Sequence, residues 1–187
     1  MRAVVLRTHG GPEVLTIEEV DDPTPGRDDI VVDVEHTAIN RADILQRMGM
    51  YPDPRRRSLE IPGLEFAGVV SAVGADVIGW SVGDRAMGIE AGGCYAGKVV
   101  THARQALPVP ASVASADAAA IPEVFLTAWD ALVVQGGLTS GRWALVHAGA
   151  SGVGTAGIQI AKAIGARIAV TCSAGKVDAC RELGADV

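Results

Sequence analysis

The sequence has little of three things: cysteine, net positive charge and long apolar runs. Its three cysteines form no C-x-x-C pair, which indicates reduced thiols in a cytosolic setting. The net charge of −6 argues against a nucleic-acid partner, because binding phosphates needs a basic patch. The densest basic run, residues 55–57, is interpreted as a solvated loop. No run approaches the length of a membrane span, and the N-terminal apolar stretch is too short for a signal peptide, so we expect a cytoplasmic protein with no membrane partner.

What the chain does contain is a strand, a glycine-rich turn and a helix in immediate succession between Trp143 and Gly157. Residues 143–147 are predicted to form a buried strand, and apolar residues recur at helical spacing over 153–164. A further strand is predicted at 167–171. This order predicts a dinucleotide site, because the glycines let the backbone approach a pyrophosphate and the helix N-terminus presents unpaired N–H groups. The alternative is a glycine-rich turn in some other α/β unit.

The register of the glycines follows from where the strand ends. Since the strand is predicted to end at His147, two residues before Gly149, we take Gly149 as the turn glycine. Gly152 and Gly154 complete the series, and Ser151 stands where the fingerprint usually has its second glycine. Gly157 then falls inside the helix, where the missing side chain would permit close packing on the strand.

The end of the second strand bears on the choice of cofactor. An NAD enzyme usually places Asp or Glu there, about 20 residues after the first glycine, to hold the 2′-hydroxyl of the ribose. No acidic residue occurs before Asp178, whereas Ser173 offers a hydroxyl and Lys176 a positive charge suited to a 2′-phosphate. We therefore expect NADPH. The alternative is that Ser173 caps a helix and Lys176 is solvated.

Residues 1–122 have an all-β character, with short apolar runs between turn residues, which suggests a small barrel or sandwich. The predicted strands include Ala3–Leu6, Ile30–Val34, Ala67–Val73 and Val99–His102. One helix is predicted at Arg41–Met48, capped by Asn40, with Ile44 and Met48 on one face.

The nucleotide-binding part is predicted to occupy residues 123–187. A helix predicted over 121–134 opens it, with Pro122 tolerated in the first turn. The last helix is predicted at 176–183, and residues 185–187 look like the entry to a third strand. A doubly wound fold needs about six parallel strands. We therefore expect the chain to be the N-terminal part of a longer protein.

Several motifs, in this order along the chain, resemble the medium-chain dehydrogenase/reductase superfamily, and specifically its zinc-independent, zeta-crystallin-like quinone oxidoreductase branch. These motifs are Asn40–Asp43, Gly49–Tyr51, Pro62–Val70, Val82–Arg85, Ile121–Trp129, Gly149–Gly154 and Leu183–Asp186. The resemblance implies an α/β plus β architecture: a GroES-like β-barrel substrate domain followed by the first βαβα part of a Rossmann fold. It also implies a substrate domain completed by C-terminal residues absent here, and a homo-oligomer in the full-length parent.

The resemblance also bears on whether the protein has a zinc site. Zinc-dependent relatives have a metal-binding Cys where this sequence has Asn40, and a ligand His where it has Leu64. Leucine cannot bind a metal, and Cys94 alone cannot build a four-thiolate structural site. We therefore expect no metal site, and direct hydride transfer from the nicotinamide, for which the protein supplies position and polarity.

Three residues match positions that the family places near the reaction. Tyr51 and Asn40 match positions lining the active cleft, where either could donate a hydrogen bond to the developing oxyanion. Thr127 matches a position near the nicotinamide. The structural alternatives are a surface aromatic at a turn for Tyr51, a helix cap for Asn40 and simple packing for Thr127.

The function expected from the resemblance is an NADPH-dependent, zinc-independent quinone oxidoreductase acting on a small-molecule quinone or conjugated carbonyl. An enone or enal reductase fits the same zinc-free cleft, and a cofactor-binding or structural protein without turnover is the alternative of another class. The residues expected to contact the cofactor are Gly149, Ser151, Gly152, Val153, Gly154, Ser173 and Lys176. Outside the site, His147 is interpreted as a satisfied core histidine, and Cys172 and Cys180 flank the cofactor loop with no base to activate them.

Overall fold

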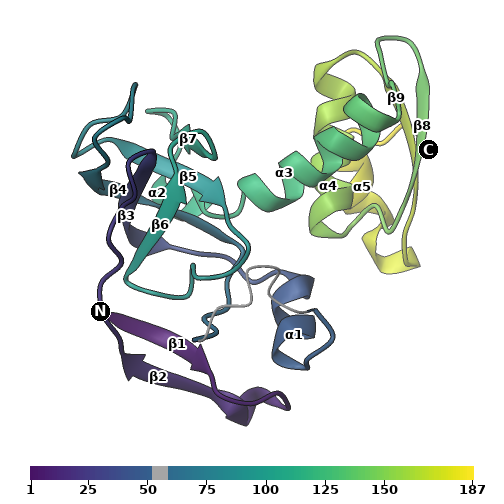
Figure 1. Ribbon diagram of the computed structural model, residues 1–187. Coiled ribbons are helices and arrows are strands. Elements are labelled where there is room, and N and C mark those ends of the chain that lie inside the picture. Colours follow the sequence, from purple (N-terminus) through teal and green to yellow (C-terminus); the bar gives the residue numbers. More distant parts are fainter. Residues whose placement is uncertain (52–58) are drawn as a thin grey trace. The chain divides into compact units, whose positions relative to one another are not determined.

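The computed structural model describes residues 1–51 and 59–187, and Figure 1 shows their arrangement into helices and strands. The basic run at 55–57, interpreted above as a solvated loop, lies outside the described residues. The chain forms two compact units, Met1–Glu123 and Val124–Val187. No helix in the described ranges is both long enough and apolar enough to cross a membrane.

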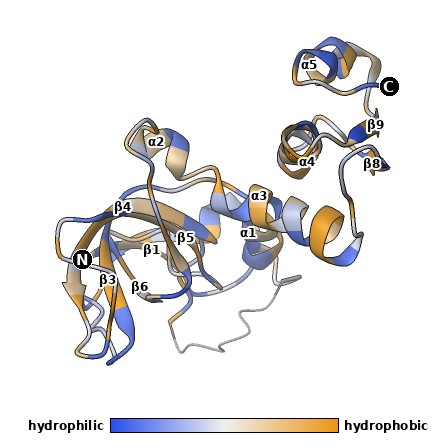
Figure 2. Ribbon diagram, turned by 90° about the horizontal axis from the view of Figure 1, so that it is seen from above, coloured by the Kyte–Doolittle hydropathy of each residue, from blue (hydrophilic) through white to orange (hydrophobic). Residues whose placement is uncertain are grey.

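The first unit is built on an antiparallel sheet of five strands in the order β6-β3-β4-β5-β7 (Figure 1). The strands are β3 (Asp29–His36), β4 (Glu65–Val73), β5 (Arg85–Ile89), β6 (Lys98–His102) and β7 (Ala106–Pro108). Its core consists of Ile30, Val32, Phe66, Val70, Ala86, Cys94, Val99 and Ala106. Strand β3 changes from hydrophobic to hydrophilic along its length (Figure 2), so its first half anchors the register on this core.

A hairpin of β1 (Arg2–Leu6) and β2 (Leu15–Glu19) completes the strands of the described part of this unit. The other edge of β1 is bonded to a loop, because the Val4 N–H donates to the Tyr95 carbonyl at 2.8 Å. All of the strands listed from the sequence are confirmed, as β1, β3, β4 and β6. Strand β2 has no counterpart among them, although its apolar and polar residues alternate as in a half-exposed strand.

Two helices belong to the first unit, α1 (Arg41–Arg47) and α2 (Ser115–Ala118). Helix α1 lies where the sequence predicted it, but the side chains that it buries are Asp43 and Gln46. Ile44 and Met48, predicted to share one face, are 42% and 47% exposed. The polar face turns inward because it has partners there: the Gln46 amide donates to Glu60 Oε1 at 2.9 Å.

The helix predicted over 121–134 is present in two forms. It begins as α3 (Pro122–Trp129) and continues as a π-helical segment, Asp130–Gln135. The wider winding is seen in the hydrogen bond from the Gly136 N–H to the Ala131 carbonyl, five residues back, at 3.0 Å. The helix ends at Gly136 and Gly137 as predicted, with φ of 62° at Gly137.

The second unit continues as a βαβα segment. Its elements are β8 (Trp143–His147), α4 (Gly152–Ala163), β9 (Arg167–Thr171), a short 3₁₀ turn (Ala174–Lys176) and α5 (Val177–Glu182). Strands β8 and β9 are parallel neighbours. Residues 185–187, predicted as the entry to a third strand, form no strand here, but they lie along β9: the Asp186 N–H donates to the Ile168 carbonyl at 2.9 Å and the Val170 N–H donates to the Val187 carbonyl at 2.8 Å.

The prediction of a buried strand at 143–147 was wrong for one face of β8. Ala144 and Val146 pack on the cluster formed with α4 and α5, but Trp143 and Leu145 are 53% and 63% exposed. Successive side chains of a strand point to opposite faces, and in the described chain the helices fill only one of them. The apolar composition of β8 is that of a strand covered on both faces.

Candidate functional site

A buried carboxylate organises the polar interior of the first unit. Glu65, at the start of β4, is 1% exposed. Its Oε1 accepts a hydrogen bond from the Asn40 side-chain amide at 2.7 Å, and its Oε2 accepts one from the backbone N–H of Glu123 at 2.9 Å. The Glu123 N–H lies at the start of α3, so the carboxylate faces the positive end of that helix. Burial, and secondarily the charge of Asp43, raises the pKa of Glu65.

A second buried carboxylate, Asp43, lies beside the first. Its Oδ2 accepts hydrogen bonds from the backbone N–H of Asn40 at 2.7 Å and from the Tyr95 hydroxyl at 2.9 Å. Burial raises the pKa of Asp43, against these bonds, which lower it. Burial and the Asp43 charge also raise the pKa of Tyr95, so its hydroxyl keeps its proton and stays a donor. Asn40, Asp43, Glu65 and Tyr95 thus form one polar network, called the Glu65 network below.

Asn40 caps helix α1 and also binds Glu65 through its side chain. Its extended backbone precedes α1, and Asp43 bonds back to it as in a capping box. The side-chain amide is bound to Glu65, which uses one of the two N–H bonds of its –NH₂ group. The side-chain carbonyl oxygen accepts from the Asp43 backbone N–H in the capping box, so one N–H donor of the amide is left for a ligand.

Tyr51 is not brought to the Glu65 network. It follows Gly49, which has a φ of 76°, at the far end of α1 from Asn40, and a helix of that length spans about 10 Å. The Tyr51 side chain is 46% exposed and has no hydrogen bond to another described residue. As a surface aromatic after a glycine turn, it is available to a ligand.

The nucleotide turn differs from the predicted register in one respect. The residue with left-handed backbone is Ala148, with a φ of 56°, and Gly149 is not the left-handed residue. Gly149 is needed for space: a Cβ there would lie 2.5 Å from the Cβ of Val170 on β9. A Cβ at Gly154 would lie 2.4 Å from the Ala148 carbonyl oxygen, so only glycine lets α4 begin this close to the turn.

The start of α4 presents unpaired donors. Ser151 is its N-cap, and the Ser151 Oγ accepts a hydrogen bond from the Gly154 N–H at 3.1 Å. The N–H groups of Gly152 and Val153 have no partner among the described residues. These are the groups on which a pyrophosphate can be held. Gly157 is buried, and a Cβ added there would lie 3.2 Å from Leu132 Cδ1. The space left by the missing side chain therefore faces Leu132, which corrects the prediction that Gly157 packs on the strand.

The loop after β9 carries the residues predicted to select NADPH. Ser173 occupies the N-cap position of the 3₁₀ turn, yet its hydroxyl makes no capping bond and is exposed. Lys176 is also exposed, and no ion pair joins it to another described residue. Both side chains are free to meet an anionic ligand.

Two further predictions about this unit are corrected or sharpened. His147 is exposed at the end of β8, so its interpretation as a core histidine was wrong; its Nδ1 lies 3.0 Å from Thr171 Oγ1 and ties the ends of the strands together. Thr127 on α3 is exposed as well, which argues against simple packing.

The sequence reasoning missed Glu65, Asp43 and Tyr95. For Glu65 a signal existed, because a carboxylate inside an otherwise apolar strand must have a buried partner. Asp43 stands three residues after a helix cap, which is the capping-box position. No local pattern marks Tyr95, whose partner lies 52 positions away.

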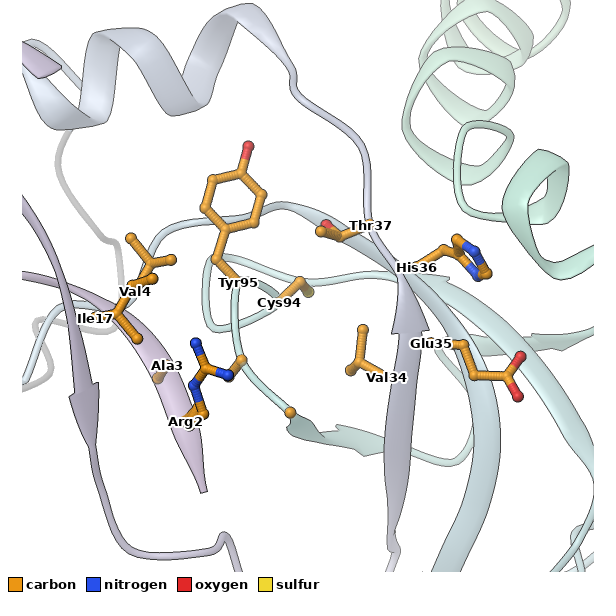
Figure 3. Close-up of a pocket in the computed structure, with 12 residues that line it drawn as sticks. Arg2, Ala3, Val4, Ile17, Val34, Glu35, His36, Thr37, Cys94 and Tyr95 are labelled. Carbon is orange, nitrogen blue, oxygen red and sulfur yellow. The ribbon is translucent and has the colours of Figure 1, made fainter.

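A separate cavity of about 380 Å³ lies in the first unit (Figure 3). Arg2, Val34, Thr37 and Tyr95 are among the side chains that line it, but none of the predicted catalytic residues is. Figure 3 shows the Tyr95 hydroxyl pointing away from Arg2 and toward α1, where Asp43 accepts its hydrogen bond. The cavity therefore borders the Glu65 network without containing its donor groups.

Comparison with known proteins gives matches over both units. A family model described as the alcohol dehydrogenase GroES-like domain matches residues 26–111. The spectinabilin polyketide synthase system protein NorB of Streptomyces orinoci is 41% identical over 162 residues, which are 87% of this chain and 7% of that protein.

Solved structures of reductases resemble the chain closely. The quinone oxidoreductase of Escherichia coli complexed with NADPH matches with a TM-score of 0.88 and 33% identity, over 99% of this chain and 57% of that one. The CurK enoyl reductase matches with a TM-score of 0.89 and 29% identity, over 99% of this chain and 58% of that one. The chain spans 3–8% of the length of eight curated relatives that it matches and 57–62% of the length of eight matched structures.

Proposed function

The chain belongs to the medium-chain dehydrogenase/reductase superfamily, and from this membership we propose that it is part of an NADPH-dependent, zinc-independent reductase that transfers hydride to a quinone. The observation that carries the proposal is the combination found at one end of β8 and β9. The unpaired N–H groups of Gly152 and Val153 suit a pyrophosphate, and the exposed Ser173 and Lys176 suit a 2′-phosphate. No carboxylate stands in that loop to hold a 2′-hydroxyl.

The donors of the first unit supply polarity for the acceptor. When bound, NADPH supplies the hydride, and the reduced quinone oxygen then carries developing negative charge. The free N–H of the Asn40 amide and the Tyr51 hydroxyl are donors that could stabilise such charge. Glu65 fixes the orientation of the Asn40 amide, because its own two oxygens are held at 2.7 and 2.9 Å. Thr127, exposed on α3, is assigned to contact with the nicotinamide.

The absence of zinc from this mechanism follows from what occupies the two ligand positions. The Asn40 amide is already bound to Glu65, and Leu64 is an apolar side chain that is 8% exposed. Neither offers the thiolate or imidazole that zinc requires in these positions. A quinone is electron-poor and accepts hydride with hydrogen bonding alone, so the site needs no Lewis acid.

A second candidate is reduction of a carbon–carbon double bond conjugated to a carbonyl. Two observations favour it: several relatives at 36–42% identity are named as polyketide synthases or proteins of such a system, and one matched structure is the CurK enoyl reductase. Hydride would then go to carbon, and the same donors would bind the carbonyl oxygen of an enoyl thioester. The two reactions differ in the acceptor and share the cofactor.

The test begins with binding. Titration of the chain with NADPH and NADH, followed by nicotinamide fluorescence, is expected to show tighter binding of NADPH. Oxidation of NADPH is then followed at constant cofactor with 1,4-naphthoquinone or with a crotonyl thioester. Faster turnover with the quinone supports the first candidate, and faster turnover with the thioester supports the second. Binding without turnover on either acceptor would leave a cofactor-binding module, and failure to bind NADPH would overturn both proposals.

A further inference from the structure

Two cysteines of the second unit have no part in the proposed hydride transfer, yet they lie together beside the loop that carries Ser173 and Lys176. Cys172 directly follows β9, and Cys180 lies on α5. Both belong to the apolar cluster shared by β9, α4 and α5. Burial, and then a hydrogen bond with Cys172, raises the pKa of the Cys180 thiol, which is consistent with neighbouring sulfurs.

The two thiols differ in access. Cys180 is 2% exposed, whereas Cys172 is partly exposed. A cavity of about 350 Å³ is lined by both of them, together with Val177 and Arg181. A molecule the size of hydrogen peroxide can therefore reach Cys172, with Cys180 behind it in the same cavity. This is the arrangement of an attacking cysteine with a resolving partner.

We propose that Cys172 and Cys180 are a redox-active dithiol that hydrogen peroxide converts into an intrachain disulfide. The Cys172 thiolate attacks one peroxide oxygen, the O–O bond breaks, and the departing hydroxide takes up a proton to become water. The Cys180 thiolate then attacks the sulfur of the Cys172 sulfenic acid, forms the S–S bond and expels hydroxide, which is protonated to a second water. The protein gives up two electrons and two protons, and peroxide is reduced. Exchange with a reduced dithiol reverses the step.

The disulfide changes the loop that it encloses. Residues 172–180 become a closed ring that contains Ser173 and Lys176. An S–S bond of about 2.05 Å is shorter than any contact between two thiols. Cys180 is fixed in the core, so the movement falls on Cys172 and on the loop that follows it. This consequence rests on the proposed function: drawing Ser173 and Lys176 inward weakens NADPH binding several-fold and leaves NADH binding unchanged.

Thiol counting tests the dithiol without reference to any activity. The reduced chain is treated with one equivalent of hydrogen peroxide, alkylated with a maleimide and analysed by mass spectrometry after non-reducing digestion. We expect the three reactive thiols of the denatured chain to fall to one, which is Cys94, buried in the first unit. A peptide pair joined through Cys172 and Cys180 should appear, and dithiothreitol should restore all three thiols. Cys172→Ser and Cys180→Ser should each abolish the joined pair, whereas Cys94→Ser should retain it.

Three retained thiols, a bridge to Cys94 or a bridge between chains would overturn the proposal. If a serine variant fails to fold, the joined peptides of the natural chain still decide it. The cofactor consequence is read separately, as the ratio of NADPH to NADH affinity before and after peroxide. A disulfide that forms in a chain unable to bind NADPH when reduced would refute the proposed function and leave the dithiol standing. A disulfide that leaves the affinity ratio unchanged would refute only the loop movement.

Discussion

The side-chain amide of Asn40 donates a hydrogen bond of 2.7 Å to Glu65, a carboxylate that is 1% exposed and lies 25 positions further along the chain. The other carboxylate oxygen is held by the backbone N–H of Glu123 at 2.9 Å. With both oxygens bound, the carboxylate has a single orientation, and so does the amide that it holds. A donor placed in advance in this way is what stabilises charge that develops during a reaction.

Glu65→Gln should separate positioning from binding. The glutamine amide can accept from only one of the two donors, because its NH₂ group is a donor itself. We expect kcat for quinone reduction to fall about tenfold, which corresponds to about 1.4 kcal/mol, with the NADPH dissociation constant unchanged. The unfolding free energy should fall by about 1–3 kcal/mol. The matched control is Glu35→Gln at an exposed position of β3; equal loss in both variants would refute a specific role for Glu65.

Tyr51→Phe tests the exposed hydroxyl. Since Tyr51 is 46% exposed and bonds to no other described residue, its loss should leave stability within about 0.5 kcal/mol. We expect turnover to fall by about tenfold or more if the hydroxyl is the donor to the acceptor oxygen. Tyr95→Phe is the comparison, because it removes the bond to Asp43 and should lower stability by about 1–2 kcal/mol. Unchanged turnover in Tyr51→Phe would remove that residue from the mechanism.

The pH dependence of stability has opposite signs at two aspartates. Burial raises the pKa of Asp43 above its ordinary value of 3.8, so its stabilising contribution is complete below that value and is lost as the pH rises through the folded pKa. The hydrogen bond from Lys98 lowers the pKa of Asp33, so its contribution is present above 3.8 and is lost as the pH falls through the folded pKa.

Urea unfolding of Asp43→Asn and Asp33→Asn between about pH 3 and about pH 7 checks both signs. The stability of the natural chain relative to Asp43→Asn should decrease as the pH rises. Relative to Asp33→Asn it should increase. Slopes of the same sign for both variants would contradict the assignment.

Gly154→Ala should be the most damaging of the glycine substitutions in the turn. The added Cβ would lie 2.4 Å from the carbonyl oxygen of Ala148, and a backbone atom cannot move aside as a side chain can. We expect a loss of stability of about 1–3 kcal/mol together with loss of NADPH binding. Gly175→Ala is the control for stability, since a Cβ there meets nothing within 4 Å. Calorimetry on both variants decides the point, and equal melting temperatures would show that the turn can relax.

Lys176→Ala should change cofactor preference without unfolding the chain. Its side chain is exposed and free of ion pairs with described residues, so stability should change by no more than about 0.5 kcal/mol. We expect NADPH affinity to fall by about tenfold and NADH affinity to stay the same, because only the former cofactor has a 2′-phosphate. Arg142→Ala, which removes another exposed cation of the second unit, should leave both affinities unchanged. A parallel loss of both affinities in Lys176→Ala would indicate a general effect of charge.

Local patterns in the sequence were sufficient for most of the elements. The strand β8, the glycine turn and α4 are neighbours in the chain, so periodicity and glycine spacing predicted them together. Burial was harder to predict: β8 has the composition of a covered strand, but Trp143 and His147 are exposed. Burial depends on which partners reach a face, and no local window contains that information.

The Glu65 network illustrates the same limit inside the site. Asn40 could be recognised as a helix cap because a cap is a local feature. Its bond to Glu65 and the bond from Tyr95 to Asp43 join positions 25 and 52 apart, through the pairing of strands and loops. Similarly, the residue with left-handed backbone in the nucleotide turn is Ala148, whereas the sequence pointed to the neighbouring Gly149 as the turn residue. Gly149 is required by the closeness of Val170, which only the folded sheet brings there.

The π-helical segment Asp130–Gln135 has a consequence for how this stretch can vary in length. A π turn takes up one residue more than an α turn over a similar rise, as the hydrogen bond from Gly136 to Ala131 shows. Deleting one residue between 130 and 135 could therefore be absorbed by rewinding the segment as an ordinary helix. Related chains that are one residue shorter at this place can keep the same helix ends. In an alignment with such a shorter chain, the gap should be placed within residues 130–135 and not in the loop that follows the helix.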